Sequence, residues 1–406
     1  MAIEVRPLEA GSPSEVDSFL RTNALAMGRS SAVRPGTPLP ATAEPDRCLV
    51  AVDGDQVVAT AQSLTFTMSV PGGRTDVPCA GVRGIAVLPT HRRRGVLRAL
   101  MERQLPELHE RGDVLACLWS TEAAIYPRFG YGVGTFGHRV NVERPAPAVV
   151  ARAGTAGADL RIRLLDDVDP DKAVATAAPV YERLRTLTPG MVNRTTAWWS
   201  TRWAEPALLV TAENASGDVD GYCRYSTTAS WCELGPANQL HVDEVVACTP
   251  AARVALWRYL FEVDLVAQWL SWHSAPHDAL PLVVDDIRSL RLTVVDGAWL
   301  RIVDLPRAIA ARAYWGDDLD VVVEVRDATC EWNDGVWRFT PAGASRTSGD
   351  PHLALDVADL ASAYLGASTI ADLARAGRIE ERRAGAVAHA DAAFRSPTPP
   401  WAVTWF

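Results

Sequence analysis

The sequence predicts an α/β fold (α+β, with mixed sheets) that is divided into more than one domain. Three observations lead to this prediction. The chain has 406 residues, too many for one ordinary hydrophobic core, and 48% of them are apolar, enough to build two or three cores. Short apolar runs bounded by glycine or proline alternate with longer segments whose apolar residues recur at helical spacing. The segment Pro145–Pro147 separates a first such region from a second.

The first region covers residues 1–147, and Asp53-Gly54 marks a hairpin turn within it. Gly112 is a helix stop signal, and Pro106 lies inside the helix that it ends. The expected elements are, in order, a helix over 14–26, strands over 47–52, 56–67 and 82–88, a helix over 96–111, a strand over 114–120 and a short helical segment over 123–128.

A second region, 148–297, repeats the layout of the first. A strand ending near Cys248 is followed by Pro250 and by an apolar-striped helix over 251–265. Only Arg253 remains of a basic turn, so we interpret this region as a copy of the first that has lost a phosphate site. A chance similarity is the alternative interpretation, because strand–loop–helix is a common unit.

The third region, 298–406, changes character and ends in an apolar tail over 401–406. Before this tail we expect a helix over 305–313, strands over 320–326 and 335–340, a polar loop over 340–351, and helices over 357–365 and 369–376.

The strongest functional signal is the segment that joins the strand over 82–88 to its helix. It contains three consecutive arginines, Arg92–Arg94, followed by Gly95. A glycine-bearing turn at a helix start presents unpaired N–H groups and the positive end of the helix dipole, which suits a phosphate. Arginine adds charge in a geometry that matches phosphate oxygens. A solvated run of charge is the alternative, but the strand before the turn and the glycine after it favour phosphate binding.

Composition excludes several classes of partner. The net charge of −9 argues against nucleic acid and favours cationic partners. No apolar stretch approaches the roughly 18 residues of a membrane span. The seven cysteines form no C-x-x-C pair, so we expect buried thiols in a reducing cytoplasm. His273 and His277 are separated by Pro276 and have no evident third ligand, so we interpret them as surface or loop residues and expect no metal.

Two further motifs lead to a family resemblance. The spacing Arg92-x-x-Gly95 after a strand is similar to the acetyl-CoA pyrophosphate loop of the GNAT acetyltransferase superfamily, although Leu97 stands where that pattern usually has glycine or alanine. The segment Ile125–Gly132, Ile-Tyr-Pro-Arg-Phe-Gly-Tyr-Gly, follows the next strand, and the chain ends on the aromatic residue Phe406. With its three-region length, the chain resembles the Eis (enhanced intracellular survival) acetyltransferases.

The resemblance implies a catalytic GNAT domain over 1–147, a degenerate GNAT-like domain over 148–297 and a sterol-carrier-protein-like domain over 298–406. It also implies a homohexamer that uses acetyl-CoA to acetylate amines of aminoglycoside antibiotics, often at several positions. The family's general acid corresponds to Tyr126, and its general base corresponds to the terminal carboxylate of Phe406. The implied cofactor contacts are Ile85, Ala86, Val87, Arg93, Arg94, Gly95, Val96, Leu97, Arg98, Thr121 and Glu122.

The implied chemistry is reasonable in physical terms. Direct transfer needs a base for the amine proton and an acid for the leaving thiolate. An α-carboxylate, with a reference pKa of about 3.5, is a weak base unless it is desolvated, and a buried apolar tail would desolvate it. Packing of the tail onto the core explains its composition equally well. Three hypotheses therefore stand: an acetyltransferase for aminoglycoside-like cations, one for protein lysines or small-metabolite amines, and a non-catalytic binder whose third region holds an apolar ligand.

Overall fold

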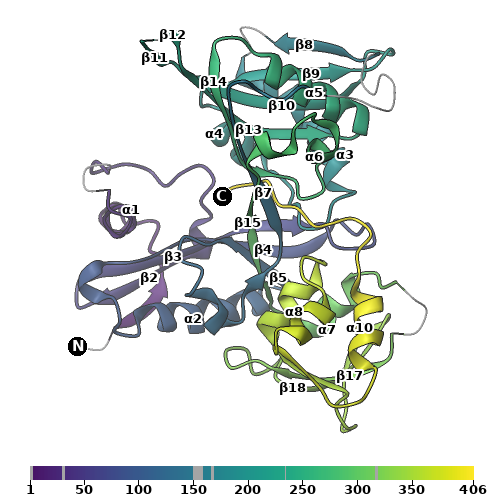
Figure 1. Ribbon diagram of the computed structural model, residues 1–406. Coiled ribbons are helices and arrows are strands. Elements are labelled where there is room, and N and C mark those ends of the chain that lie inside the picture. The colour runs from purple at the N-terminus through teal and green to yellow at the C-terminus, as the bar shows by residue number, and fades with distance from the viewer. Residues whose placement is uncertain (1–2, 30–32, 150–158, 166–168, 234, 316–318) are drawn as a thin grey trace. The chain divides into compact units, whose positions relative to one another are not determined.

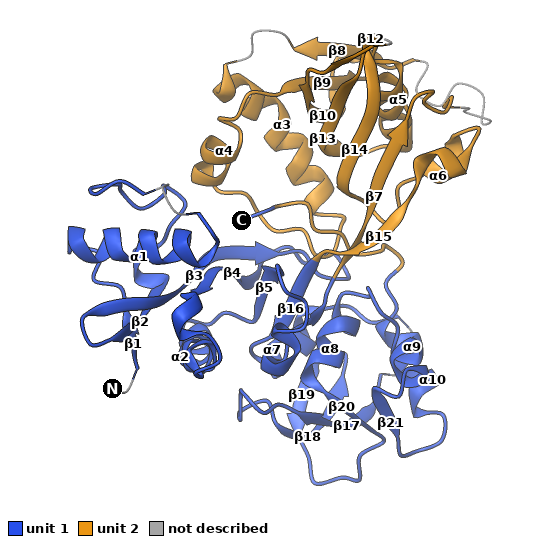
Figure 2. Cartoon of the chain, turned by 60° about the vertical axis from the view of Figure 1, so that its left-hand side comes forward, with its two compact units in different colours: residues 1–134, 298–396, 405–406 blue, residues 135–297, 397–404 orange. Residues whose placement is uncertain are grey.

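A computed structural model describes residues 3–29, 33–149, 159–165, 169–233, 235–315 and 319–406 (Figure 1). The chain forms two compact units (Figure 2). Unit 1 contains residues 1–134, 298–396 and 405–406, and unit 2 contains residues 135–297 and 397–404. Both units are therefore built from segments that are distant in the sequence.

The first sheet of unit 1 has seven strands in the order β1-β2-β3-β4-β5-β16-β6. They are β1 (Glu4–Pro7), β2 (Cys48–Asp53), β3 (Gln56–Met68), β4 (Val77–Val87), β5 (Leu115–Trp119), β16 (Ala298–Ile302) and β6 (Gly132–Val133). Two helices, α1 (Pro13–Ala26) and α2 (Val96–Glu110), pack on it.

Strand β2 shows why this sheet is covered on both faces. Leu49 and Ala51 belong to one buried cluster with Leu100 of α2, whereas Val50 belongs to another with Phe19 of α1. Successive side chains of a strand point to opposite faces, so the continuous apolar run of β2 packs against α1 on one face of the sheet and against α2 on the other.

Strands β4 and β5 separate partway along their length. Their parallel pairing joins Cys79–Gly81 to Leu115–Cys117 and ends there, although β4 continues to Val87. On its other edge β4 carries a bulge, because Gly84 and Ile85 lie opposite a single residue of β3, and Gly84 has a φ of +60°. The separation leaves backbone hydrogen-bonding groups of β4 without a partner strand on the β5 side.

The remainder of unit 1 is a five-stranded sheet with four helices (Figures 1 and 2). The strands are β19 (Gly343–Arg346), β18 (Gly335–Thr340), β17 (Val321–Arg326), β20 (Leu353–Asp356) and β21 (Ile379–Glu381). The helices are α7 (Leu305–Ala311), α8 (Val357–Tyr364), α9 (Ile370–Arg375) and α10 (Ala386–Phe394). The expectation of a loop over 340–351 is wrong in part, because Gly343–Arg346 pairs antiparallel with β18.

Buried polar groups join this part to the first sheet. The guanidinium of Arg301 in β16 is fully buried and donates to both carboxylate oxygens of Asp327 at 2.7 Å. The Asn333 amide donates to the carbonyls of Ile302 and Val303, and its oxygen accepts from the backbone of Leu305. A buried polar group without a hydrogen bond would destabilise the fold, so these hydrogen bonds fix how the two parts of unit 1 pack.

Unit 2 contains a second seven-stranded sheet in the order β15-β7-β14-β13-β10-β9-β8, with a small hairpin. Its strands are β7 (Phe136–Glu143), β8 (Arg161–Leu165), β9 (Leu208–Glu213), β10 (Val219–Thr228), β13 (Asn238–Ala247), β14 (Val266–Ser274) and β15 (Thr293–Asp296), and the hairpin is β11 (Trp231–Cys232) and β12 (Gly235–Pro236). Its helices are α3 (Pro170–Arg185), α4 (Thr196–Arg202), α5 (Pro250–Glu262) and α6 (Leu280–Val283).

The two large sheets take strands from across the expected domain boundaries. Strand β7, from the region expected to be the first domain, lies in the second sheet, and β16, from the expected third domain, lies in the first. The boundaries 1–147, 148–297 and 298–406 therefore stay predictions. The short helical segment expected over 123–128 is a 3₁₀ helix, η3 (Tyr126–Phe129).

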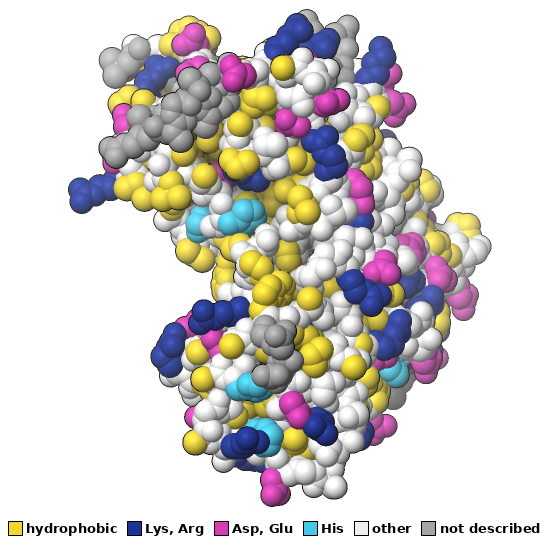
Figure 3. Space-filling model, turned by 90° about the vertical axis from the view of Figure 1, so that its right-hand side faces the viewer, with side chains coloured by type: hydrophobic (Ala, Val, Ile, Leu, Met, Phe, Trp, Pro, Cys, Tyr) yellow, Lys and Arg dark blue, Asp and Glu magenta, His cyan; other side chains and the backbone are white. Residues whose placement is uncertain are grey.

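Two properties of the chain bear on its partners. Among the described residues, no helix combines the length and apolar character needed to span a lipid bilayer. On the face shown in Figure 3, Lys and Arg side chains are interspersed with Asp and Glu rather than gathered in one stripe.

Candidate active site

The turn before α2 has the geometry of an anion site. Gly95 precedes the helix with a φ of +83°, and no side chain caps the helix start. The first helical hydrogen bond runs from the Ala99 N–H to the Gly95 carbonyl, so the N–H groups of residues 96–98 have no partner within the helix. A Cβ added to Gly95 would meet no atom within 4 Å, so the turn is open on that side. Free donors at a positive helix end favour a phosphate group.

The three arginines of this turn have different roles. Arg92 donates to the carbonyls of Ala26 (3.0 Å) and Val87 (3.3 Å), which ties the end of α1 to the end of β4. Arg94 lies 3.7 Å from the carboxylate of Asp53. Arg93 is exposed with a φ of +61°, and neither it nor Arg98 has a hydrogen bond or ion pair in the part of the chain that the structure describes. Arg93 and Arg98 are the cations available to a ligand.

The corresponding turn of unit 2, before α5, has a capped helix start and a paired arginine. The Thr249 hydroxyl caps α5 by accepting from the Ala252 N–H at 3.1 Å. Arg253 is buried, where it donates to the Asp278 carboxylate at 3.3 Å and to the Ala247 carbonyl at 3.2 Å. Because the side chain of Thr249 satisfies a helix-end donor and Arg253 faces inward, this turn lacks the features that suit Gly95 and Arg93 to an anion.

The predicted cofactor contacts on β4 lie beyond the point where β4 and β5 separate. Ile85 and Val87 are half-buried and Ala86 is buried. The Gly84 carbonyl accepts from Thr60 Oγ1 (2.8 Å) and from the Asn23 amide (3.2 Å). These two bonds hold the bulge in place, and they were not foreseen from the sequence.

The remaining predicted cofactor residues differ in how exposed their side chains are. Thr121 and Glu122 are exposed in the turn that follows β5. Val96 packs in the core and Leu97 is half-buried, so these two have their backbone N–H groups to offer to a ligand rather than their side chains.

Tyr126 opens η3 directly after that turn. Its side chain is 8% exposed and its ring meets the edge of Tyr131, with centroids 5.9 Å apart. Burial, and then the charge of Glu122, raise the pKa of the Tyr126 hydroxyl above its usual value. Tyr126 therefore keeps its proton across the neutral range, as a general acid must.

The last two residues pack on the first sheet. The Phe406 ring lies 5.1 Å from that of Phe66 in β3, and a Cβ added to Gly81 would come within 3.1 Å of it. The Trp405 indole stacks on Trp119 at 3.9 Å. Phe66, Gly81 and Trp119 were missed from the sequence, and no local signal marks them.

Strand β4 contributes residues to the surroundings of both predicted catalytic residues. Tyr126 belongs to the buried cluster that contains Ala80 and Val82, whereas Phe406 packs against Gly81 between them. Neighbouring residues of a strand face opposite ways, so Gly81, against which Phe406 packs, faces away from Ala80 and Val82. Gly81 is also the last residue of β4 that pairs with β5.

The histidines singled out in the sequence lie in unit 2, and the interpretation of His273 is corrected. His273 is buried within β14, at 8% exposure, and burial lowers its pKa to about 4. Its ring fits against Gly137 and Gly297, where an added Cβ would approach within 2.6 and 2.8 Å. His277 lies in the turn after the strand, half-buried. Across the described residues, no group of three or more His, Cys, Asp or Glu side chains is arranged to hold a metal ion.

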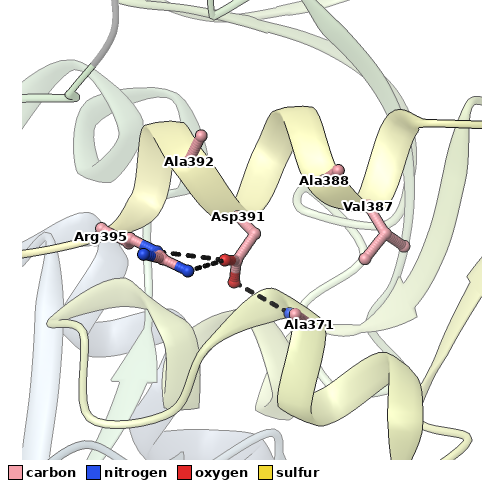
Figure 4. Close-up of a pocket in the computed structure, with 6 residues that line it drawn as sticks. All are labelled: Ala371, Val387, Ala388, Asp391, Ala392 and Arg395. Atoms are coloured by element: carbon pink, nitrogen blue, oxygen red, sulfur yellow. Dashed lines mark hydrogen bonds and ion pairs between the residues drawn. The ribbon is translucent and has the colours of Figure 1, made fainter.

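A pocket of about 490 Å³ lies in the third region, between α9 and α10 (Figure 4). Among its lining groups, the Asp391 carboxylate accepts from the Ala371 N–H and from the Arg395 side chain. None of the predicted site residues lines it.

Comparisons with known proteins identify all three parts of the chain. Residues 4–134 and residues 190–302 each match a family model described as an acetyltransferase (GNAT) domain, and residues 305–403 match a sterol carrier protein domain. These matches confirm the predicted fold class: mixed α/β, with two GNAT domains followed by a sterol-carrier-protein-like domain.

Relatives match over most of the chain. An uncharacterized N-acetyltransferase of Streptomyces avermitilis is 40% identical, over 88% of this chain and 89% of its own. The N-acetyltransferase Eis of Mycobacterium tuberculosis is 33% identical over 85% of each chain. The crystal structure of Eis1 from Mycobacterium abscessus, 33% identical, superimposes over 100% of both chains with a TM-score of 0.83. The chain is an N-acetyltransferase that belongs to the Eis family of the GNAT superfamily.

Proposed function

We propose that this enzyme transfers acetyl from acetyl-CoA directly to amines of polycationic acceptors, aminoglycosides in particular, at several positions of one molecule. One observation carries the proposal. The open anion turn at Arg93–Gly95, the buried Tyr126 and the terminal Phe406 all belong to unit 1, and Phe406 packs against Gly81, where the pairing of β4 with β5 ends.

The residues present suit acetyl-CoA. The free N–H groups of residues 96–98 and the unpaired guanidinium of Arg93 would hold its pyrophosphate, and the freed edge of β4 at Ile85–Val87 would hold its extended arm. Thr121 and Glu122 are exposed in the turn after β5 and are the remaining contacts that we propose. Bound acetyl-CoA supplies the acetyl group as a thioester.

The two predicted catalytic groups account for the proton balance. The acceptor nitrogen forms a bond to the acetyl carbon as the carbon–sulfur bond breaks. The Phe406 carboxylate takes the proton that the nitrogen loses, and Tyr126 gives its proton to the departing sulfur. The Phe406 ring packs against Phe66 and Gly81, which holds the chain end on the first sheet.

Charge supports a cationic acceptor. A net charge of −9 attracts polycations and repels anionic acceptors. Family resemblance supports the aminoglycoside class, a cytoplasmic location and assembly as a homohexamer. Protein lysines and small-metabolite amines remain the competing acceptors.

The experiment is a thiol-release assay with acetyl-CoA and a panel of aminoglycosides, polyamines and lysine peptides, run on the wild type and on Tyr126→Phe. The proposal expects the highest kcat/KM with aminoglycosides, several acetyl groups per molecule by mass spectrometry, and a large loss of kcat in Tyr126→Phe with unchanged acetyl-CoA affinity. Faster turnover of a lysine peptide would reassign the acceptor. Turnover equal to wild type in Tyr126→Phe would remove the acid.

A further inference from the structure

The segment that joins β5 to β6 and carries Tyr126 is held at both ends by one strand. Strand β16 lies between β5 and β6 in the first sheet, and all three strands belong to unit 1 (Figure 2). On one edge of β16, Ala298 pairs with Trp119 at the end of β5, and on the other edge Leu300 pairs with Gly132 of β6. The β5–β6 segment therefore starts and ends against β16.

Tyr131 connects the end of this segment to Tyr126. The Tyr131 N–H donates to the Tyr126 carbonyl at 3.3 Å, and the two rings meet edge to face with centroids 5.9 Å apart. The Tyr131 side chain is fully buried, and its hydroxyl has no hydrogen-bond partner among the described residues. Packing, and not a hydrogen bond from its side chain, therefore holds the Tyr131 ring beside Tyr126.

The backbone on one side of Tyr131 is in close contact with two buried side chains. A Cβ added to Gly130 would come within 2.7 Å of Val357 Cγ1 and within 2.8 Å of Arg301 Cζ, which is too short for a real Cβ contact. Gly130 also has a φ of +79°, a conformation that favours glycine. Val357 is the first residue of α8 and is 1% exposed, so the segment meets a side chain that is fixed in the core.

The backbone on the other side of Tyr131 lies against the same helix. A Cβ added to Gly132 would overlap the carbonyl oxygen of Ala358 and the hydroxyl of Ser362, both in α8. The Ser362 hydroxyl donates to the Ala358 carbonyl at 3.1 Å, so both groups are held by the helix itself. Because glycine has no Cβ, α8 can contact the segment on both sides of Tyr131.

The Arg301 guanidinium that lies against Gly130 is fixed by its partner. Asp327 accepts from Arg301 with both carboxylate oxygens, and it also accepts from the N–H groups of Thr329 and Cys330. Both side chains of the ion pair are at most 1% exposed. A planar guanidinium with charge-assisted hydrogen bonds to a carboxylate that is itself held by the backbone keeps its position, so Gly130 packs on a rigid group.

Most of these contacts come from the sterol-carrier-protein-like domain. Asp327 and α8 lie within residues 305–403, which match that domain, whereas Tyr126 lies within residues 4–134, which match a GNAT domain. The pocket between α9 and α10 of the same domain is lined by none of the residues that touch the β5–β6 segment. The domain therefore contacts the candidate active site through a surface that needs no apolar ligand.

We propose that the sterol-carrier-protein-like domain positions the Tyr126 hydroxyl for proton transfer, through α8 and through the ion pair of Asp327 with Arg301. This role rests on the proposed function, in which Tyr126 is the acid. The helix and the ion pair act through the backbone of Gly130–Gly132, so their residues are positioning residues and not catalytic ones. The domain needs no contact with either substrate to act in this way.

Val357→Ala tests the contact, because it removes two methyl groups that face Gly130 and leaves every charge in place. A displacement of about 1 Å can lower a rate on the order of a hundredfold, and the lost methyl groups leave room for part of it, so kcat is expected to fall about tenfold. Acetyl-CoA affinity is expected to stay unchanged, because the Gly95 turn precedes another helix, α2. Val323→Ala in β17 is the matched control: Val323 is 2% exposed, loses the same two methyl groups and lies in the five-stranded sheet, so its kcat should stay close to wild type.

A double-mutant cycle separates positioning from general destabilisation. We would measure kcat, acetyl-CoA affinity and melting temperature for the wild type, Val357→Ala, Tyr126→Phe and the double variant. If α8 acts through the Tyr126 hydroxyl, Val357→Ala lowers kcat about tenfold in the wild type and has little effect in Tyr126→Phe, which has no hydroxyl to misplace. Equal losses of kcat in the two backgrounds, or wild-type kcat in Val357→Ala, would overturn the inference.

Tyr131→Leu provides the same cycle if Val357→Ala fails to fold, because it removes the ring that contacts Tyr126 and leaves α8 intact. The cycle also distinguishes the two proposals. If Tyr126→Phe alone keeps the kcat of the wild type, Tyr126 is not the acid, and the proposed mechanism fails together with this inference. If Tyr126→Phe loses kcat and the effects of the two changes simply add, the positioning role alone fails.

Discussion

The indole of Trp405 stacks on the indole of Trp119, with ring centroids 3.9 Å apart and planes inclined by 16°. Trp119 is the last residue of β5, and Trp405 is the residue before the chain end. The pair therefore ties the terminal residue to the strand that borders the candidate active site. Trp405 is 43% exposed, so it contributes contact at the surface and not to the core.

Replacing Trp405 with alanine should lower kcat and leave acetyl-CoA affinity unchanged. An aromatic pair contributes about 0.5–1.5 kcal/mol beyond its buried area, which corresponds to a loss of about 2- to 12-fold if that energy holds the terminus in place. Steady-state kinetics and calorimetry measure the two quantities. Trp231→Ala is the matched control, because Trp231 is 76% exposed on the β11–β12 hairpin. Equal kcat in the two variants would mean that the stack has no part in catalysis.

Arg93 and Arg92 should behave differently when each is replaced by alanine. Arg93 has no partner among the described residues, so Arg93→Ala should weaken acetyl-CoA binding about tenfold, the size of one exposed charge-assisted hydrogen bond, with little change in melting temperature. Arg92→Ala removes the bonds to the Ala26 and Val87 carbonyls and should lower the melting temperature. Calorimetry and thermal unfolding separate the effects. Unchanged acetyl-CoA affinity in Arg93→Ala would show that the turn binds something else.

The alkaline limb of the pH profile of kcat should reflect the ionisation of the Tyr126 hydroxyl. Burial and the charge of Glu122 raise the pKa of Tyr126, so activity should persist to higher pH than a free tyrosine would allow and fall as the pH rises through this pKa. Glu122→Gln removes a negative charge that disfavours the phenolate, so its limb should move to lower pH. Because Glu122 is also a predicted cofactor contact, the position of the limb is the test and not the size of kcat. A limb that stays in place in Glu122→Gln, and also in Tyr126→Phe, would belong to another group.

Acid should destabilise the protein through His273. Burial holds the pKa of His273 at about 4 in the folded state, against about 6.5 when unfolded. The unfolded chain then binds more protons between pH 6.5 and 4, so stability falls as the pH falls through this window, by about 3 kcal/mol in total. Guanidinium unfolding at several pH values should show this slope, and His273→Gln should reduce it. Equal slopes in the two proteins would mean that the histidine is not buried in its neutral form.

Much of the fold and of the anion turn could be predicted from patterns of neighbouring residues. The strand, the turn at Arg92–Gly95 and helix α2 could be predicted because apolar spacing and a glycine at the helix start are properties of neighbouring residues. The different contacts made by the arginines of this turn could not be predicted. They depend on where the carbonyls of Ala26 and Val87 lie, and only the folded chain brings these to Arg92.

Non-local pairing accounts for the rest. Nothing in the composition of residues 136–143 says that this strand joins the second sheet, because partner choice is set by strands that are far away in the sequence. His273 was expected at the surface or in a loop. Its burial depends on Gly137 and Gly297, which approach its ring from remote parts of the chain. The contacts of Arg194 with Thr404 span 210 positions and have no sequence signature.

In the proposed mechanism, the carboxylate of Phe406 removes the proton from the acceptor amine. The most direct measurement compares kcat of the wild type with that of a semisynthetic protein whose chain ends in the carboxamide of Phe406, at full length and with every side chain in place. The carboxamide protein is expected to show a large loss of kcat with unchanged acetyl-CoA affinity, because the amide removes the base and leaves every side chain in place. Wild-type turnover by the carboxamide protein would contradict it.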